Sequence, residues 1–352
     1  AGELKTKPTQ HSVKTLMESG VQADILVCRT EHELGSSIRT KLARFCNVKE
    51  NCVIQSIDAS TIYDVPNLIL DEGLDKVVLN QLKLKRHKPD LEFWNTFLEK
   101  HKNPVYEINI GLIGKYVELQ DSYKSILEAF IHAGAANEVK VNVKSIHSEH
   151  IDLSNTKELL FNLDGVLVAP GFGERGIEGK IEAIRYVREH KIPFFGICLG
   201  MQMAVIEFSR NVVGLKGANS SEMDADCPYH VIDLMEDQKQ VENKGGTMRL
   251  GAWDCTLLDG SVAHSVYNKK TISERHRHRY EFNENYKKQI ESNGMIATGI
   301  NPDTGLVEIV EIEDHPWFVG VQYHPEYKST VANPHPLFKA FIKAALDFQK
   351  NN

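Results

Sequence analysis

The residues best suited to chemistry in this sequence are a cysteine held between two glycines and a histidine–glutamate pair far downstream. Residues 196–200 read Gly-Ile-Cys-Leu-Gly and directly follow the apolar run 192–195. A strand that enters Gly-x-Cys-x-Gly and then a helix is the pattern of a nucleophile elbow, a sharp turn that exposes the reactive side chain. The N-terminus of the helix expected over 202–212 favours the thiolate form of Cys198. The pattern therefore predicts that Cys198 is a nucleophile.

A base for this thiol is predicted at the end of another strand. Residues 319–323, Val-Gly-Val-Gln-Tyr, predict a strand that ends at His324, and Glu326 follows two positions later. An imidazole oriented by a carboxylate is what a thiol nucleophile needs. A lone cysteine is most often a buried apolar residue, and a lone His-Pro-Glu is most often a loop cap. Their combination in this order favours a catalytic triad of Cys198, His324 and Glu326.

Attack of a thiolate on an amide also requires two N–H donors for the oxyanion that forms. The backbone N–H of Leu199 offers one. A buried strand expected from residue 166 ends in the turn Pro-Gly-Phe-Gly at 170–173, where Gly171 lets the main chain approach a substrate closely. We therefore predict an oxyanion hole formed by Leu199 and Gly171.

These residues must be positioned by alternating strands and helices in the second part of the chain. Besides the strands already named, strands are expected at 108–114 and 139–143 and helices at 122–135 and 177–190. Such alternation predicts a mainly parallel sheet whose ligands bind at the carboxyl ends of its strands. Since Cys198, Gly171 and His324 all follow expected strands, we expect them to meet at one edge of the sheet.

The first part of the chain shows a shorter alternation. Buried strands are expected at 22–29 and 52–57, with a helix at 37–46 between them. Residues 80–104 are polar and carry no strand pattern, so we expect a helical linker whose basic cluster is a solvated face. The predicted domains are therefore residues 1–95, a linker at 96–105, and residues 106–352.

Composition argues against several classes of protein. The 352 residues leave room for about two domains, and the net charge of -7 argues against a nucleic-acid or anionic-membrane surface. No apolar run approaches the roughly 20 residues of a membrane span. The six cysteines lack the spacing of a metal site, so we expect no metal, free thiols and a reducing, cytoplasmic location.

The triad and the Gly171 turn together resemble a class I glutamine amidotransferase domain. Four further segments, at 2–13, 171–179, 245–251 and 274–280, resemble the CTP synthase family and occur in its order. The resemblance runs from Gly2 to about Gln349. It implies an α/β fold with mainly parallel sheets, in which a truncated, Rossmann-like segment of the synthase (amidoligase) domain precedes a flavodoxin-like glutamine amidotransferase domain.

The resemblance also implies a reaction. In this family the glutaminase domain hydrolyses L-glutamine, and the ammonia travels internally to the synthase domain. There ATP phosphorylates UTP, and ammonia displaces the phosphate to give CTP. The resemblance implies no cofactor for glutamine hydrolysis, ATP and Mg2+ for the complete enzyme, and GTP as an allosteric activator. It further implies a homotetramer built through the synthase domain, with no nucleic-acid or membrane partner.

Site residues follow from the resemblance position by position. It makes Cys198 the nucleophile, His324 the general base and acid, and Glu326 the residue that orients the imidazole. It implies that glutamine is held by Gly171, Leu199, Gly200, Met201, Gln202, Glu222 and Arg279. The α-ammonium and α-carboxylate of glutamine suit one acid and one guanidinium. Without the resemblance, Glu222 and Arg279 would be assigned to ordinary surface ion pairs.

Nucleotide sites are implied in the same way. For UTP, or for CTP as product inhibitor, the matching residues are Lys5, Thr6, Lys7, Pro8, Thr9, Gln10 and Lys41. The loop at 5–10 offers ammonium and hydroxyl groups to a triphosphate, although such a stretch by itself is typical of a solvated loop. Asp58 matches the ATP-base region. Arg175, Gly176 and Glu178 match the lid through which GTP activates the family.

The chain departs from the family pattern in two places. It has no Gly-x-x-x-x-Gly-Lys-Ser/Thr phosphate loop, and it opens at Ala1 without a methionine. We therefore expect the N-terminal synthase segment to be missing, and the chain alone to show at most glutaminase activity and no CTP synthesis. Residues 169–171 read Ala-Pro-Gly where Pro-Gly-Gly is expected, a change that keeps Gly171.

Two alternatives remain open. The first is a triad glutaminase that serves a different synthase, or a γ-glutamyl hydrolase, and the segment 5–10 argues against it. The second is a catalytically idle fragment that senses nucleotides or assembles through its residual synthase part, and the intact triad argues against it. Glutamine turnover, and its dependence on GTP or UTP, distinguishes these readings.

Overall fold

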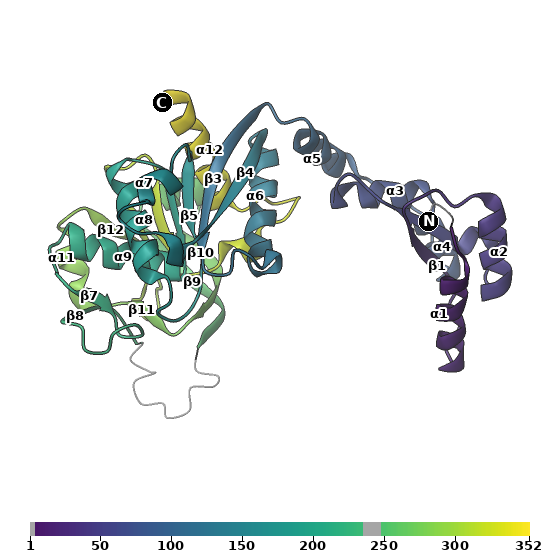
Figure 1. Ribbon diagram of the computed structural model, residues 1–352, viewed down its shortest axis with the longest axis horizontal. Helices are drawn as coiled ribbons and strands as arrows, with labels where there is room; N and C mark the ends of the chain where they lie inside the picture. Colours follow the sequence, from purple (N-terminus) through teal and green to yellow (C-terminus); the bar gives the residue numbers. More distant parts are fainter. Residues whose placement is uncertain (1–3, 235–247) are drawn as a thin grey trace. The chain divides into compact units, whose positions relative to one another are not determined.

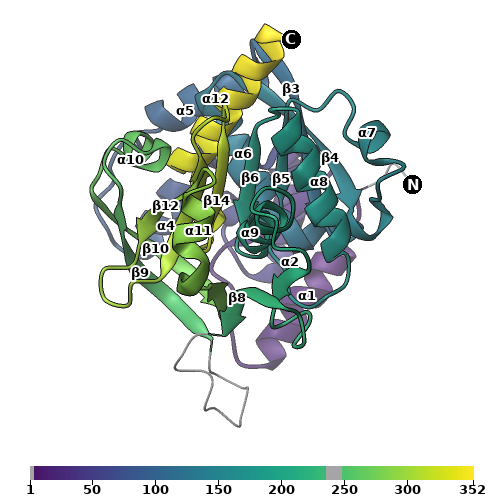
Figure 2. The same ribbon diagram turned by 90° about the vertical axis from the view of Figure 1, so that its left-hand side faces the viewer.

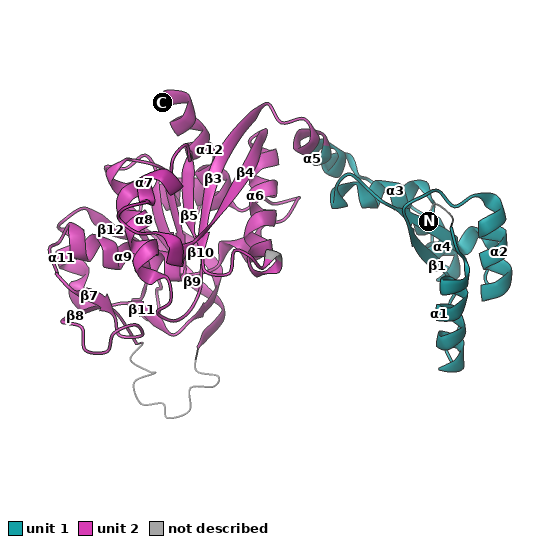
Figure 3. Ribbon diagram, viewed as in Figure 1, with its two compact units in different colours: residues 1–98 teal, residues 99–352 magenta. Residues whose placement is uncertain are grey.

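The protein divides into two compact units, residues 1–98 and residues 99–352 (Figure 3). The structure, a computed structural model, describes residues 4–234 and 248–352. Parts of two segments that resemble the CTP synthase family, residues 2–3 and 245–247, lie outside the described residues. No described helix is both long and apolar enough to cross a membrane.

The first unit is built around two parallel strands. Its elements, in chain order, are α1 (Lys7–Glu18), β1 (Leu26–Thr30), α2 (Ser36–Cys46), η1 (Glu50–Cys52), β2 (Val53–Ile57), η2 (Ile62–Asp64), α3 (Val65–Asp71), α4 (Leu74–Gln81) and the start of α5 (Glu92–Lys102). β1 pairs with β2 in parallel. Val13, Leu26, Leu42 and Val53 form the centre of a small core between these strands, α1 and α2.

Three expectations for this unit need correction. The strand expected at 22–29 begins only at Leu26, and alternate residues such as Val27 point away from the core and are exposed. The loop expected at 5–10 is largely the first turn of α1, where Pro8 is favourable because a first-turn N–H has no helical acceptor. The linker expected to be helical over 80–104 is not helical at 82–91, where Pro89 disfavours helix at the preceding residue.

The second unit contains a nine-stranded sheet with the order β10-β9-β12-β13-β14-β6-β5-β3-β4 (Figure 1). The parallel strands are β14 (Phe318–Val321), β6 (Phe194–Ile197), β5 (Gly165–Val168), β3 (Tyr106–Gly114) and β4 (Val139–His147). The antiparallel extension consists of β9 (Arg249–Leu257), β10 (Thr271–His278), β12 (Met295–Ile300) and β13 (Val307–Ile312). The predicted α/β class with mainly parallel sheets is confirmed, and the antiparallel extension is an addition to it.

Helices cover both faces of this sheet. One face carries α8 (Ile177–Glu189) and α9 (Leu199–Asn211), which lie side by side in Figures 1 and 2, and the other carries α6 (Lys124–Ala136) and α12 (Pro336–Asn351). Val166 and Val168 of β5 join the core under α8 and α9, whereas Leu167 joins the core under α6 and α12. Burial on both faces explains why the parallel strands are continuous apolar runs.

Shorter elements complete the second unit. They are η3 (Gln120–Tyr123), η4 (Ser148–His150), α7 (Thr156–Leu159), β7 (Ala218–Ser220), β8 (Tyr229–Leu234), α10 (Val262–Tyr267), β11 (Tyr280–Phe282), η6 (Glu284–Tyr286), α11 (Lys287–Glu291) and η7 (Pro325–Lys328). β7, β8 and β11 form a separate three-stranded sheet. Because β10 ends at His278 and β11 begins at Tyr280, Arg279 connects the two sheets.

Candidate active site

Cys198 occupies a strained turn between β6 and α9. Its φ of 51° and ψ of -103° are costly for a residue with a side chain. The flanking glycines permit the close crossing of chains, because a Cβ at Gly200 would lie 2.2 Å from the carbonyl oxygen of Val168 and one at Gly196 would lie 2.8 Å from the backbone of Gly200. α9 begins at Leu199, earlier than the predicted start at 202, so its N-terminus directly follows Cys198. The turn has the geometry of a nucleophile elbow.

His324 and Glu326 follow β14, the strand that pairs in parallel with β6. Nδ1 of His324 is 2.7 Å from Oε1 of Glu326, and both side chains are buried. The N–H of Cys198 donates to the carbonyl of Val321 at 2.7 Å, and the N–H of His324 donates to the carbonyl of Arg275 at 2.8 Å. Among the described residues, Nε2 of His324 has no hydrogen-bond partner. This nitrogen is therefore available to exchange a proton with the thiol or with a substrate.

The electrostatics of the site favour a charged imidazole. Burial by itself lowers the pKa of His324, but the charge of Cys198, together with the hydrogen bond to Glu326 and its charge, outweighs burial and raises this pKa to about 11. A thiolate beside an imidazolium is the reactive form of a cysteine nucleophile. The structure thus brings the three predicted catalytic residues together in an arrangement that is competent for attack on a carbonyl.

A small pocket adjoins the sulfur. It is lined by Gly171, Phe172, Cys198, Gln202, Glu222, Met248, His278, Arg279 and Tyr280. Phe172, Met248, His278 and Tyr280 are additions to the predicted residues. All four additions lie in the segments 171–179, 245–251 and 274–280 that resemble the CTP synthase family, which is the signal that could have found them.

The pocket presents an acid and a guanidinium. Oε1 of Glu222 accepts a hydrogen bond of 3.0 Å from the N–H of Gly173, so the acid and the glycine turn hold each other in place. Arg279 follows β10 and also lines the pocket. Together they can bind the α-ammonium and the α-carboxylate of an amino acid.

Three residues matched to glutamine binding are not among the lining residues of this pocket. Leu199 and Met201 lie in the core under α8 and α9, and Gly200 packs against β5. The side chains of Leu199 and Met201 pack in this core, so only the main-chain atoms of residues 199–201 can face a ligand. The predicted contacts of these three residues are therefore restricted to main-chain atoms.

Two lysines support the glycine turn. Nζ of Lys180 donates to the carbonyl of Ala169 at 2.9 Å, and Nζ of Lys115 donates to the carbonyl of Phe172. Lys180 is fully buried, and this burial, followed by the charge of Lys115, lowers its pKa to about 7. Neither lysine is predicted from sequence. The sequence signal that could have identified Lys180 is its position on the apolar face of the helix expected at 177–190.

The residues matched to the GTP lid lie at the start of α8. Nε of Arg175 pairs with Oε1 of Glu149 at 2.9 Å, and Glu178 pairs with Arg210 at 2.9 Å. Gly176 has a φ of 74°, a conformation that favours glycine. The three residues are gathered in one segment, and its charged side chains are paired within the protein.

The residues matched to UTP or CTP lie in the first unit. The exposed residues in this group are Lys5, Lys7, Pro8 and Lys41, whereas Thr9 is partly buried. Thr6 is buried, and its hydroxyl accepts a hydrogen bond of 3.1 Å from the amide of Gln10. Asp58, matched to the ATP-base region, pairs with Arg29. The side chains of the three lysines, Lys5, Lys7 and Lys41, are thus accessible to a phosphate group in solution.

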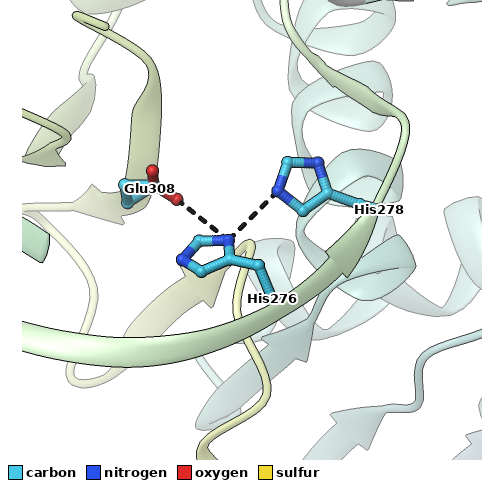
Figure 4. Close-up of side chains that lie close together, drawn as sticks. All are labelled: His276, His278 and Glu308. Carbon is cyan, nitrogen blue, oxygen red and sulfur yellow. Dashed lines mark hydrogen bonds and ion pairs between the residues drawn. The ribbon is translucent and has the colours of Figure 1, made fainter. Parts of the chain in front are cut away.

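His276, His278 and Glu308 are a buried group of described residues with the spacing of metal ligands (Figure 4). Nη1 of Arg249 already neutralises Glu308 at 2.5 Å from its Oε1. Nδ1 of His276 lies 3.1 Å from Nε2 of His278 and 3.5 Å from Oε2 of Glu308. The cluster thus contains a hydrogen bond between the histidines and an ion pair from Glu308 to Arg249, while Nε2 of His276 and Oε2 of Glu308 have no hydrogen-bond partner among the described residues.

Comparison with known families matches both parts of the chain. Residues 118–344 match the family model described as Glutamine amidotransferase class-I, and residues 1–84 match the model described as CTP synthase N-terminus. The chain is 72% identical over 346 residues to the CTP synthase of Christiangramia forsetii and 69% identical over 351 residues to that of Flavobacterium johnsoniae. These alignments cover 98% and 99% of this chain.

A solved structure agrees with the architecture of the second unit. The glutaminase domain of Trypanosoma brucei CTPS, solved with bound acivicin, is 36% identical, with a TM-score of 0.65 over 68% of this chain and 94% of that chain. By fold and site, the chain belongs to the class I glutamine amidotransferases. Within that class it belongs to the CTP synthase family. It spans 63% and 65% of the length of the two curated relatives named above.

Proposed function

We propose that the chain hydrolyses L-glutamine to L-glutamate and ammonia. The observation that carries this proposal is the buried pair of His324 and Glu326, 2.7 Å apart, beside the strained turn of Cys198. The thiolate attacks the side-chain amide carbon, and the N–H groups of Leu199 and Gly171 stabilise the oxyanion. His324 donates a proton to the departing ammonia, which leaves a thioester. It then takes a proton from the water that cleaves the thioester, and the thiolate returns.

We propose that Glu222 binds the α-ammonium of glutamine and that Arg279 binds its α-carboxylate. Both residues line the pocket beside the sulfur. The amide nitrogen of Gln202 is used in hydrogen bonds to Tyr280 and Gln322, so its oxygen is the group left to accept from the ammonium. Main-chain atoms of residues 199–201 complete the contacts.

The ammonia, we propose, serves the amination of UTP to CTP in a complete CTP synthase. The match of residues 1–84 to the CTP synthase N-terminus and the identity to two CTP synthases support this step. The triphosphate of UTP or CTP would contact residues 5–10 and Lys41, and ATP with Mg2+ would serve the same half of the reaction, with Asp58 near the ATP base. GTP would act at Arg175, Gly176 and Glu178. The complete enzyme would be a cytoplasmic homotetramer.

The test is glutamate release from L-glutamine by the purified chain, with and without GTP, beside Cys198→Ala. Release that the substitution abolishes supports the glutaminase, and stimulation by GTP supports its place in a CTP synthase. Cys227→Ala, at another buried free cysteine, is the matched control and should keep the activity. No release under any condition, even with a separately made N-terminal synthase segment added, contradicts the proposal.

A further inference from the structure

A continuous line of hydrogen bonds runs through the interior of the second unit to the nucleophile. At its end, Nε2 of Gln322 donates to Sγ of Cys198 at 3.6 Å. Oε1 of Gln322 accepts from Nε2 of Gln202 at 3.1 Å, and the same nitrogen of Gln202 donates to the carbonyl of Tyr280 at 2.9 Å. Both glutamines are buried. Because water cannot replace these partners, the two amides have one favourable orientation.

Beyond Tyr280 the line continues through the two histidines drawn in Figure 4. Nδ1–H of His278 donates to the carbonyl of Tyr280 at 3.1 Å, which leaves Nε2 of His278 to accept from Nδ1–H of His276 at 3.1 Å. Burial, followed by the charge of Arg249, lowers the pKa of His278 to about 3. Burial, followed by His278 and Arg249, lowers the pKa of His276 to about 2. Both rings are therefore neutral near pH 7, and the direction of each bond is fixed.

Glu308 of β13 fixes the far end of the line. Its carboxylate pairs with Arg249 and lies 3.5 Å from Nδ1 of His276, and its backbone carbonyl accepts the N–H of Gln322 at 2.9 Å. One residue thus touches both His276 and Gln322. Displacing Gln202 or His278 would remove the hydrogen-bond partner of a buried polar atom of Gln322 or His276, at a cost of about 1–3 kcal/mol, so this part of the line holds its geometry.

We propose that Gln322 is a positioning residue whose amide donates a hydrogen bond to the thiolate of Cys198, and that the line from Arg249 to Gln202 holds this amide in place. The inference rests on the proposed glutaminase, because it concerns the same nucleophile. Sulfur is a weak acceptor as a thiol, and hydrogen bonds to charged acceptors are stronger, so the bond favours the thiolate. A neutral donor achieves this without forming an ion pair that would have to break during attack.

Gln322→Glu tests the proposal with little change in shape. The carboxylate can still accept from Gln202, but it cannot donate to the sulfur. The readout is the pH dependence of alkylation of Cys198 by iodoacetamide in the full chain, followed by mass spectrometry of the peptide that contains it. In Gln322→Glu we expect the midpoint of the alkylation pH profile to rise by about one pH unit or more. We also expect kcat for glutamine to fall about tenfold or more, while KM stays within about threefold of the wild-type value.

Apart from residue 322 itself, the described titratable groups around the sulfur are the same in the wild-type and variant chains. They are His324 after β14, Lys180 on α8, and Glu222, His278 and Arg279 in the pocket. Gln289→Glu adds the same charge on the exposed face of α11 and should leave the midpoint unchanged. Gln322→Met removes the donor without burying a charge. It should shift the midpoint in the same direction, by less, and it keeps the test decisive if Gln322→Glu does not fold.

The rest of the line is tested at His278. His278→Leu removes the donor to the carbonyl of Tyr280 and should raise the midpoint, whereas His278→Asn retains an N–H for that carbonyl and should recover part of the shift. An unchanged midpoint in both Gln322 variants overturns the proposal. A wild-type midpoint that moves on addition of EDTA also overturns it, because a bound metal would then organise the histidines. Alkylation needs no turnover, so a wild-type chain that releases no glutamate contradicts the proposed function and leaves this test valid.

Discussion

The ammonium group of Lys180 lies 2.9 Å from the carbonyl oxygen of Ala169, just before the turn that carries Gly171. The lysine is fully buried on α8, and its charge interacts with Cys198. Charges interact strongly in a low-dielectric interior. A buried cation beside the turn and the thiol can therefore stabilise the negative charge that attack on an amide develops, in addition to holding the turn in place.

The burial of Lys180 predicts how stability changes with pH. Burial, followed by Lys115, lowers the pKa of Lys180 from 10.5 to about 7 in the folded chain. Between these two values the unfolded chain binds more protons, so the free energy of unfolding rises with pH by up to about 1.4 kcal/mol per unit. Calorimetric unfolding midpoints should therefore rise more between pH 7 and pH 9 in the wild-type chain than in Lys180→Met. Equal changes of the unfolding midpoint in the two proteins would show that a group other than Lys180 causes the pH dependence.

Glu326→Gln should lower kcat for glutamine hydrolysis by about 10²–10⁴-fold. Glu326 is one of the two groups that raise the pKa of His324 against the effect of burial. Removing its charge lowers that pKa and makes the imidazolium less stable, while the residues that line the pocket beside the sulfur are unchanged. Steady-state kinetics should therefore show KM within about threefold of the wild-type value. Glu313→Gln, at an exposed position after β13, is the control and should behave as wild type.

Arg279→Lys should raise KM for glutamine by about 10–100-fold and leave kcat within about threefold. A lysine keeps the charge but loses the planar pair of donors that matches a carboxylate. Comparing L-glutamine with its α-carboxamide separates the two effects, because the wild-type chain should lose affinity for the amide and the variant should lose much less. An unchanged KM would place the α-carboxylate elsewhere. Arg44→Lys, on the exposed face of α2, is the matched control.

The turn at Cys198 and the pair His324–Glu326 could be predicted because each is encoded by a few consecutive residues. Gly196 and Gly200 flank the cysteine in the sequence. Glycine is required at both positions for a local steric reason, because a Cβ would collide with the backbone where the chain segments cross. The start of α9 was less predictable, because its N-cap is Cys198, which makes no side-chain capping bond and so leaves no capping signal. Roles taken from the family for the nucleotide residues remain predictions.

The polar line to Gln322 could not be predicted in the same way. β10 alternates between exposed and buried residues, but its buried positions include Glu274, His276 and His278. A strand whose inward side chains are polar carries no hydrophobic alternation, so the pattern that reveals strands is absent. The contacts also join β10, β13 and β14, and which strands pair depends on the whole sheet rather than on any one segment.

Two glycine substitutions should separate fold from function at the site. A Cβ at Gly200 would lie 2.2 Å from the carbonyl oxygen of Val168, a backbone atom that cannot move away. A Cβ at Gly171 would make ordinary contact, 3.4 Å from Cδ2 of Leu199. We therefore expect Gly200→Ala to lose about 2 kcal/mol or more of stability.

We expect Gly171→Ala to keep the wild-type unfolding midpoint and to lose at least about tenfold in kcat. Its methyl group enters the space where the oxyanion must approach the main chain. Thermal unfolding and glutamate release, measured on the same preparations, make the comparison. A fully active Gly171→Ala chain would place the second oxyanion donor elsewhere, whereas a chain that is inactive but folded would locate it at this turn.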